Sequence, residues 1–600
     1  MHGYRGKILR VNLTDHTWKV EDLDEKKALS YIGGRGLGSK IMAEEVDPNV
    51  DAFSPENKVI IATGPLTGTP TPAGGRYMVV TKSPLSGTIA SSNSGGYWGS
   101  ELKFAGYDLI ILEGKSPKPV NVFIEDDKVE LRDASHVWGK IVSETTEALA
   151  KEAPDKAKIL CIGPAGEKLS KIAAVMNDIN RAAGRSGVGA VLGSKNLKAI
   201  VVKGSSKPTI ANPDKLKEVT KAARQNIKDN GVTGQGLPTY GTAVLVNIIN
   251  EGGVFPTNNF QTTYFDKAEN ISGEHLAENF LIKRESCFAC PIACGRYAKA
   301  DDIEGGGPEY ETIWAFGAAC GVSDMKEVIK ANYWCNELGL DTISAGVTIA
   351  AAMELYQRGK IKDNDIDEGL SLKFGDAKSM VEWTKKMGNR EGMIGDKMAE
   401  GSHRMGEHFG MPEVAMAVKK LELPAYDPRG IQGQGLQYAT SNRGGCHVRG
   451  YMISPEILGL PQKLDRFAID GKAEWVKIFQ DLTAYIDSAG LCLFTSFAID
   501  AKGYADMISA VIGQEFSDAD ILEAGDRIWN LERNYNLKAG IDPSQDTLPK
   551  RLLEDPIPDG PSKGNKSRLS EMLPIYYNIR GWDESGIPKP ETLQKLQVEA

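Results

Sequence analysis

The chain has 600 residues, of which 41% are hydrophobic and 25% are charged, as expected for a globular protein of about three or four domains. Its formal net charge of −9 at pH 7 argues against a nucleic-acid-binding protein, because binding to phosphates favours a basic surface. No apolar run approaches the ~20 residues that cross a bilayer, and eight cysteines are too few for a secreted disulfide scaffold, so we expect a cytoplasmic protein without a membrane span.

The first third of the chain, residues 1–210, is predicted to be rich in strands. Its start, MHGYRGKILRVNLTD, goes directly into an alternating strand pattern and shows no signal-peptide core. Short β-branched runs bounded by Gly, Pro and Asp predict strands at 7–14, 57–64, 76–82, 108–114, 120–126, 157–163 and 197–204. Many of the 65 glycines cluster in loops of this region, which suggests backbone held close to a ligand.

After Pro213 the apolar residues take a helical spacing, with Pro213 at a first-turn position. Helices are predicted at 325–338, 345–358, 377–387, 394–409, 474–488 and 518–538. The predicted fold class is therefore α+β. We expect a β-rich N-terminal domain (1–210) that binds the cofactor, followed by two mainly helical domains (211–417 and 418–600).

The stretch CFACPIACGR places Cys287, Cys290 and Cys294 in a C-x2-C-x3-C arrangement. Three thiolates at this spacing can wrap one metal centre. The spacing favours a [4Fe–4S] cluster over structural zinc, which normally uses a second cysteine pair or paired histidines. It also disfavours a redox dithiol, which needs only two cysteines. A fourth ligand has to come from a distant part of the chain, and spacing does not choose among Cys320, Cys335, Cys446 and Cys492.

The glycine-rich loops do not complete any nucleotide-binding motif, but four of them combine backbone N–H donors with nearby arginines. Such loops suit phosphates and flat heterocycles, so we expect a large phosphorylated cofactor. The sequence contains two internal echoes, which have two interpretations. GLGSK (36–40) resembles VLGSK (191–195), and NELGLDTIS (336–344) resembles DSAGLCLFTS (487–496). They reflect either chance plus helix-capping glycines or two similar sets of loops that hold two copies of one ligand.

Two polar clusters complete the candidates for chemistry. GGGPEYETIW contains Glu309 and Glu311 beside a glycine run, and SNRGGCHVRGY contains His447 next to Cys446 and Arg449. From the residues alone, a single histidine is more often structural than catalytic, and a glutamate pair is more often a solvated turn.

Taken together and in this order, the motifs resemble those of the tungsten-containing aldehyde:ferredoxin oxidoreductases, over essentially the whole chain. They are GKILRVNLT, IGGRGLGSK, GPLTG, SSNSGGYWG, NRAAGRSGVGAVLGSKNLKAI, GPEYETIWAFG, the cysteine triplet, GLDTIS, GGCHVRGY and DSAGLC. The resemblance implies an N-terminal β domain that forms a base for the cofactor and two helical domains that cap it.

The resemblance also implies the site residues. The [4Fe–4S] cluster would be held by Cys287, Cys290, Cys294 and Cys492. Two pterin-dithiolenes would share one tungsten or molybdenum, and backbone carbonyls of Asn93 and Ala183 would hold a bridging Mg²⁺. Glu311 and His447 would lie beside the metal as catalytic residues. The cofactor-binding residues would be Arg76, Asn93, Gly95, Arg181, Ala183, Gly184, Asp341, Arg449, Asp487 and Leu491.

The function that the resemblance implies is oxidation of an aldehyde to a carboxylic acid, with electrons passed through the cluster to a ferredoxin or a ferredoxin-like subunit. The alternative within the family is the tungsten subunit of a benzoyl-CoA reductase-type complex, and the alternative of another class is a binding protein stabilised by zinc or a cluster. We expect a homodimer or a hetero-oligomer. An acidic ferredoxin would need a basic patch near the cluster, for which Lys283, Arg284 and Arg296 are candidates.

Overall fold

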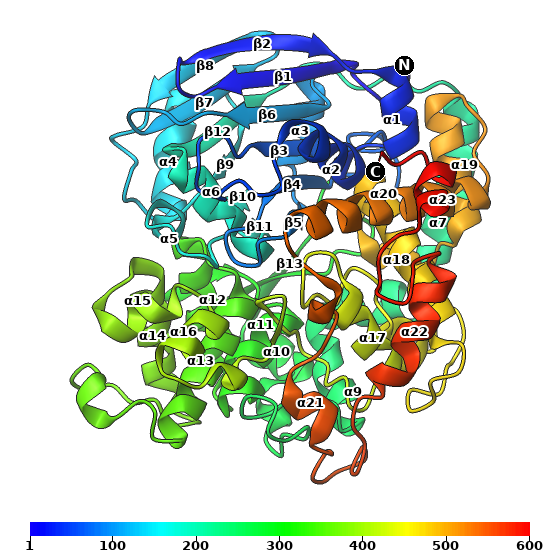
Figure 1. The fold of residues 1–600 in the computed structure, drawn as a ribbon. Helices are drawn as coiled ribbons and strands as arrows, with labels where there is room; N and C mark the ends of the chain where they lie inside the picture. Colours follow the sequence, from blue (N-terminus) through cyan, green and yellow to red (C-terminus); the bar gives the residue numbers. More distant parts are fainter. Residues whose placement is uncertain (600) are drawn as a thin grey trace.

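The computed structural model describes residues 1–599 (Figure 1). The strands of the first 203 residues form the upper part of the molecule, and the helices that follow lie below and beside them. The predicted α+β class, with a β-rich N-terminal region followed by helical domains, is confirmed. The division of the helical part at residue 417 stays a prediction.

The N-terminal region contains two six-stranded mixed sheets, and all seven predicted strands are present in them. The first sheet has the order β2-β1-β6-β3-β4-β5. Its strands are β1 (Lys7–Asn12), β2 (Thr17–Asp22), β3 (Val59–Thr63), β4 (Tyr77–Lys82), β5 (Ile89–Ser94) and β6 (Leu109–Glu113). The second sheet is β7 (Val120–Glu125), β8 (Lys128–Asp133), β9 (Lys158–Cys161), β10 (Val175–Asn177), β11 (Arg181–Ala183) and β12 (Leu197–Lys203).

The two sheets repeat one topology. Read from its other edge, the second sheet has the order β8-β7-β12-β9-β10-β11, which matches the first sheet strand for strand. In each sheet the first hairpin strand pairs in parallel with the last strand, β1 with β6 and β7 with β12, and every other pair is antiparallel. This repeat favours the interpretation that the sequence echoes mark two similar sets of ligand loops.

Short helices connect these strands. They are α1 (Glu25–Tyr31), α2 (Gly34–Glu45), α3 (Trp98–Phe104), α4 (Val142–Glu152), α5 (Pro164–Glu167) and α6 (Val188–Ser194). The echoed GLGSK and VLGSK segments are therefore not free loops, because the first lies within α2 and the second in and just after α6. α2 packs on β3 and β4, and the glycines at its N-terminal end approach Asp487 and Ser488 in the helical part, whereas α6 packs on β12 and β4.

The rest of the chain is mainly helical. Its helices are α7 (Pro213–Asp229), α8 (Leu237–Tyr240), α9 (Leu245–Glu251), α10 (Gly273–Asn279), α11 (Tyr310–Phe316), α12 (Met325–Leu338), α13 (Thr342–Gln357), α14 (Ala377–Asn389), α15 (Gly392–Met398), α16 (Ser402–His408), α17 (Gln432–Thr440), α18 (Lys472–Ala489), α19 (Ala501–Ile512), α20 (Asp518–Lys538), α21 (Lys550–Glu554), α22 (Leu569–Ile579) and α23 (Pro590–Lys595). The predicted helix 394–409 is two helices, because Gly401 has a φ of 89°, outside the helical region. A three-stranded sheet contains β13 (Leu281–Glu285), β14 (Gly295–Ala300) and β15 (Ile303–Gly306). A two-stranded sheet contains β16 (Ala417–Val418) and β17 (Leu421–Glu422).

The ends of α12 and α18 dock on equivalent turns of the two sheets. A β-carbon on Gly163, which follows β9, would lie 2.3 Å from the carbonyl oxygen of Leu338 at the end of α12. A β-carbon on Gly64, which follows β3, would lie 2.1 Å from the carbonyl carbon of Ala489 at the end of α18. Glycine at both turns therefore allows the helix ends, and the echoed GLD and GLC segments after them, to lie directly on the sheets.

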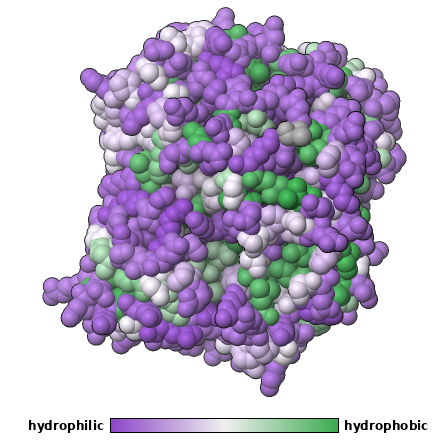
Figure 2. Space-filling model, in the orientation of Figure 1, coloured by the Kyte–Doolittle hydropathy of each residue, from purple (hydrophilic) through white to green (hydrophobic). Residues whose placement is uncertain are grey.

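The face drawn in Figure 2 is mostly hydrophilic, with apolar areas scattered over it. Within residues 1–599, no helix is both long and apolar enough to span a bilayer.

Candidate functional site

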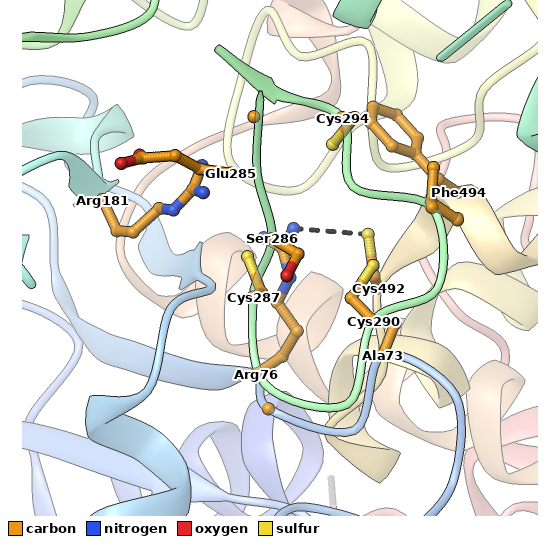
Figure 3. A pocket seen from close by; sticks show the side chains of 13 residues that line it. Ala73, Arg76, Arg181, Glu285, Ser286, Cys287, Cys290, Cys294, Cys492 and Phe494 are labelled. Carbon is orange, nitrogen blue, oxygen red and sulfur yellow. Dashed lines mark hydrogen bonds between the residues drawn. The ribbon is translucent and has the colours of Figure 1, made fainter. Parts of the chain in front are cut away.

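The cysteine triplet lies in the loop that joins the antiparallel strands β13 and β14. Ala289 and Ala293 in this loop have a φ of 52°, a left-handed conformation that curls the chain between the cysteines. Cys287, Cys290 and Cys294 face one pocket, and Cys492, three residues after the end of α18, lines the same pocket beside Cys290 (Figure 3). The structure therefore brings the four predicted cysteines together.

The four thiols surround a space and do not converge on one point. Within residues 1–599, no group of three or more His, Cys, Asp or Glu side chains is placed to hold a single metal ion. Four cysteines that line one pocket suit a group with several metal atoms. Burial raises the pKa of the Cys290 and Cys294 thiols, so metal binding at these cysteines would release protons.

Neither Cys320 nor Cys335 lies in this pocket. Cys320 is fully buried, and its thiol donates to the carbonyl oxygens of Ala315 and Gly346 at 3.3 and 3.4 Å. Burial also raises the pKa of both thiols. They behave as small buried hydrophobic side chains.

Arg76 connects the cysteine pocket to the end of α18. Its Nη2 donates to Cys492 Sγ at 3.3 Å (Figure 3). Its Nη1 donates to Asn93 Oδ1 at 3.0 Å, and Asn93 Nδ2 donates in turn to Asp487 Oδ1 at 3.3 Å. Burial opposes the charge of Arg76, but the surrounding cysteine sulfurs hold the pKa of its guanidinium above the ordinary value. A β-carbon on Gly95 would lie 2.8 Å from Cys287 Sγ, so this loop needs glycine where it meets the cysteines.

The two predicted aspartates both contact arginines of the echoed segments. Asp487 Oδ2 accepts from Arg35 at 3.3 Å and also from Arg449, and Asp341 Oδ2 accepts from Arg185 Nε at 2.9 Å. The positions are similar but not equivalent, because Asp487 lies in the last turn of α18 whereas Asp341 is the N-cap of α13. Sequence reasoning did not select Arg35 or Arg185, although both lie in the quoted glycine loops.

Four buried arginines lie near one another where the sheets meet the helical part. Burial first, and then Arg443 and Arg35, lower the pKa of Arg449 to about 9. Arg185, Arg443 and Arg449 all lie near enough to Cys446 to lower the pKa of its thiol against the effect of burial. Asp341, Asp487 and Glu532 pair with the other arginines, whereas Arg443 has no carboxylate partner in the described chain. Its remaining positive charge suits an anionic group such as a phosphate.

Several polar atoms near these arginines are buried without a hydrogen-bond partner in the described chain. An unsatisfied buried polar group costs about 1–3 kcal/mol, so a cluster of them indicates a missing ligand. The atoms are Ser186 Oγ, Asn442 Oδ1, Arg443 Nε, His447 Nδ1 and Glu311 Oε1. The residues present therefore fit a large polar cofactor with anionic groups.

The other predicted cofactor residues lie on the two sheets, at the cysteine pocket, beside Asp341 and next to Cys492. Asn93 lies on β5 and Ala183 ends β11, the corresponding edge strands of the two sheets, which pack on each other. Arg181 lines the cysteine pocket, and Gly184 would place a β-carbon 3.7 Å from Asp341 Oδ1. Leu491 is fully buried directly before Cys492.

A separate cavity of about 300 Å³ contains Glu311, from α11, and His447. Glu311 Oε1 lies 3.5 Å from His447 Nε2, and Glu311 Oε2 accepts from the Ala425 amide at 2.9 Å. Burial raises the pKa of Glu311 to about 8, and burial together with Arg185 and Arg443 lowers the pKa of His447 well below its ordinary value. Near neutral pH, Glu311 is mainly protonated and His447 is neutral, so the contact is not an ion pair. The solvated-turn interpretation of Glu311 is wrong.

One candidate for the basic patch is wrong. Arg296 is buried, and its guanidinium donates to the carbonyl oxygens of Thr239 at 2.9 Å and Ala293 at 2.9 Å. These hydrogen bonds link the cysteine loop to the segment around Thr239 in the interior of the protein. Lys283 and Arg284 are exposed on β13 beside that loop.

Comparisons with known proteins cover the whole chain. Residues 8–204 match the model for the N-terminal domain of aldehyde ferredoxin oxidoreductase, and residues 218–598 match the model for its domains 2 and 3. The chain is 55% identical to a tungsten-containing aldehyde ferredoxin oxidoreductase of Pyrococcus furiosus, with 100% of this chain and 99% of that protein covered, and 54% identical to that of Thermococcus kodakarensis at the same coverage. Among solved structures, it is similar to the active-site complex BamBC of benzoyl coenzyme A reductase, with a TM-score of 0.86, 26% identity, and 100% and 97% of the two chains covered.

Proposed function

The chain belongs to the aldehyde ferredoxin oxidoreductase family, and we propose that it oxidises aldehydes to carboxylic acids at a tungsten centre and passes the electrons through a [4Fe–4S] cluster to a ferredoxin. The observation that carries this proposal is the relation between the two sites. The cavity with Glu311 and His447 and the pocket with four cysteines share one wall residue, Phe494.

The family resemblance suggests which residues would hold the cofactors, and the contacts described above support that assignment. Cys287, Cys290, Cys294 and Cys492 would bind the cluster. The pterins would lie between the two sheets and the helical part, against Asp341 and Asp487 and their arginines, with Mg²⁺ held by Asn93 and Ala183. When bound, these groups take two electrons from the substrate and release them singly.

The protein side chains would handle oxygen and protons. The reaction RCHO + H₂O → RCOOH + 2H⁺ + 2e⁻ needs a polarised carbonyl oxygen and an acceptor for the protons. His447 would donate a hydrogen bond to the substrate oxygen, and deprotonated Glu311 would take the proton from the attacking water. The apolar lining of the cavity would exclude other water from the reacting carbon.

We place the electron acceptor at the exposed side of the cysteine loop, where Lys283 and Arg284 would face an acidic ferredoxin. A cytoplasmic location and a homodimer or hetero-oligomer belong to the same proposal. The benzoyl-CoA reductase alternative has less support, because the chain is 26% identical to that complex and 55% identical to the aldehyde-oxidising relative.

Elemental analysis and an activity assay test this function. Protein purified without oxygen is expected to contain one tungsten and about four irons per chain, and to reduce a viologen dye when an aldehyde is added. Zinc alone would contradict the proposal. Reduction of benzoyl-CoA without aldehyde oxidation would instead support the alternative.

A further inference from the structure

A short 3₁₀ helix, η9 (Leu493–Phe497), begins directly after Cys492 and carries two phenylalanines that each separate two cavities. Phe494 lines both the cysteine pocket and the cavity with Glu311. Phe497 lines that same cavity and a larger groove of about 760 Å³. The two rings are stacked, with centroids 5.7 Å apart and an angle of 16° between their planes.

The groove beyond Phe497 lies between α7, α18 and α19, and most of its walls are apolar. Its apolar residues include Val219, Trp475, Ile478, Phe479, Leu482 and Ile499. Lys502, the only cationic side chain among the described lining residues, is paired with Asp506 at 2.9 Å. An uncharged apolar chain therefore fits this groove, and an anionic tail would find no free cation in it.

The backbone around Phe497 is held without the help of its ring. Asn230 Nδ2 donates to the Phe497 carbonyl oxygen at 2.9 Å. Thr495 Oγ1 donates to the Cys492 carbonyl oxygen at 2.7 Å and also contacts the Tyr504 hydroxyl at 2.7 Å. Shortening the Phe497 side chain should therefore leave Cys492 in place.

We propose that Phe497 determines the chain length of the aldehydes that this protein oxidises. Its ring lies between the cavity of about 300 Å³ and the groove, so at this end it limits the room for the tail of a substrate whose carbonyl lies at Glu311 and His447. Removing the ring joins the cavity to an apolar groove that can receive the tail of a longer aldehyde. This inference rests on the proposed aldehyde oxidation in the same cavity.

The test is a series of unbranched aldehydes, from propanal to dodecanal, assayed as kcat/KM for viologen reduction by the holoenzyme. For the wild type, kcat/KM should rise with chain length and then level off. For Phe497→Ala it should continue to rise beyond that point, by about fourfold per added methylene, which corresponds to burial of about 0.8 kcal/mol per CH₂ group. Phe497→Trp should move the levelling-off point to shorter chains.

Phe494→Ala is the matched control, since it removes the stacked neighbouring ring on the side of the cysteine pocket. It should leave the levelling-off point where it is in the wild type. Phe497→Leu replaces Phe497→Ala if the alanine variant loses tungsten or iron. An unchanged profile in an active, metal-loaded Phe497 variant, or an equal shift in Phe494→Ala, would overturn this inference alone. A wild type that oxidises no aldehyde would overturn the proposed function as well.

Discussion

Cys492→Ala is expected to abolish the iron–sulfur cluster and, with it, electron transfer to ferredoxin. Cys492 is the only one of the four cysteines in the pocket that comes from outside the β13–β14 loop, and Arg76 Nη2 donates directly to its sulfur. Without it, the cluster would have only three cysteine ligands, and Arg76 would lose one of its two side-chain hydrogen bonds. The EPR signal of the reduced cluster should disappear, and iron per chain should fall from about four toward zero.

Cys320→Ala is the control, because Cys320 lies in the helical core away from the pocket. The substitution leaves a small cavity that costs about 1 kcal/mol of unfolding free energy, and the EPR signal should remain. A cluster that survives Cys492→Ala but is lost in Cys320→Ala would refute the ligand assignment. Loss in both variants, with normal far-UV circular dichroism, would also contradict it.

The sequence pattern predicted the helices and strands better than the contacts between them. The helices at 325–338 and 518–538 match α12 and α20 at both ends, because apolar periodicity and end signals agree there. The predicted helix 394–409 is interrupted because one glycine, Gly401, adopts a positive φ. Periodicity does not register a single backbone conformation of this kind.

Contacts between distant residues could not be predicted from local pattern. The pair of Arg35 with Asp487 spans 452 positions, and that of Arg185 with Asp341 spans 156. The internal echo left chance and two similar sets of loops as alternatives, and the repeated sheet topology was needed to favour the second. Likewise, spacing left four candidates for the fourth cluster ligand. The family resemblance selected Cys492, and the structure places it in the pocket.

Local sequence pattern also could not distinguish the catalytic candidate Glu311 from its neighbour Glu309. GPEYETIW contains two glutamates that the pattern treats alike, yet they have different surroundings. Glu309 accepts a hydrogen bond from the Thr242 hydroxyl at 2.6 Å, whereas Glu311 faces His447 and has one carboxylate oxygen without a hydrogen-bond donor in the described chain. Burial, which raises the pKa of Glu311, depends on the tertiary structure and cannot be read from the motif.

Glu311→Gln is expected to lower kcat by about 10²–10⁴-fold, the usual contribution of a positioned general base. The amide keeps the size of the side chain and can still accept from the Ala425 amide, but it cannot take a proton. In the wild type, kcat should rise as the pH increases through about 8, because Glu311 must lose its proton to act as the base. The variant should lack this rise. The measurement is a pH profile of kcat for the metal-loaded enzyme.

The melting temperature of Glu311→Gln distinguishes a loss of catalysis from a loss of folding. Because the pKa of Glu311 is raised in the folded state, the folded protein holds this proton more tightly than the unfolded chain does, and that contribution to stability is lost as the pH rises through about 8. Glutamine does not ionise, so Glu311→Gln avoids the cost of a buried carboxylate charge. The variant should therefore melt at a higher temperature than the wild type above this pH. Glu407→Gln, which changes an exposed carboxylate outside the cavity, should alter neither kcat nor its pH profile. Normal activity of Glu311→Gln with unchanged pH dependence would remove Glu311 from the mechanism.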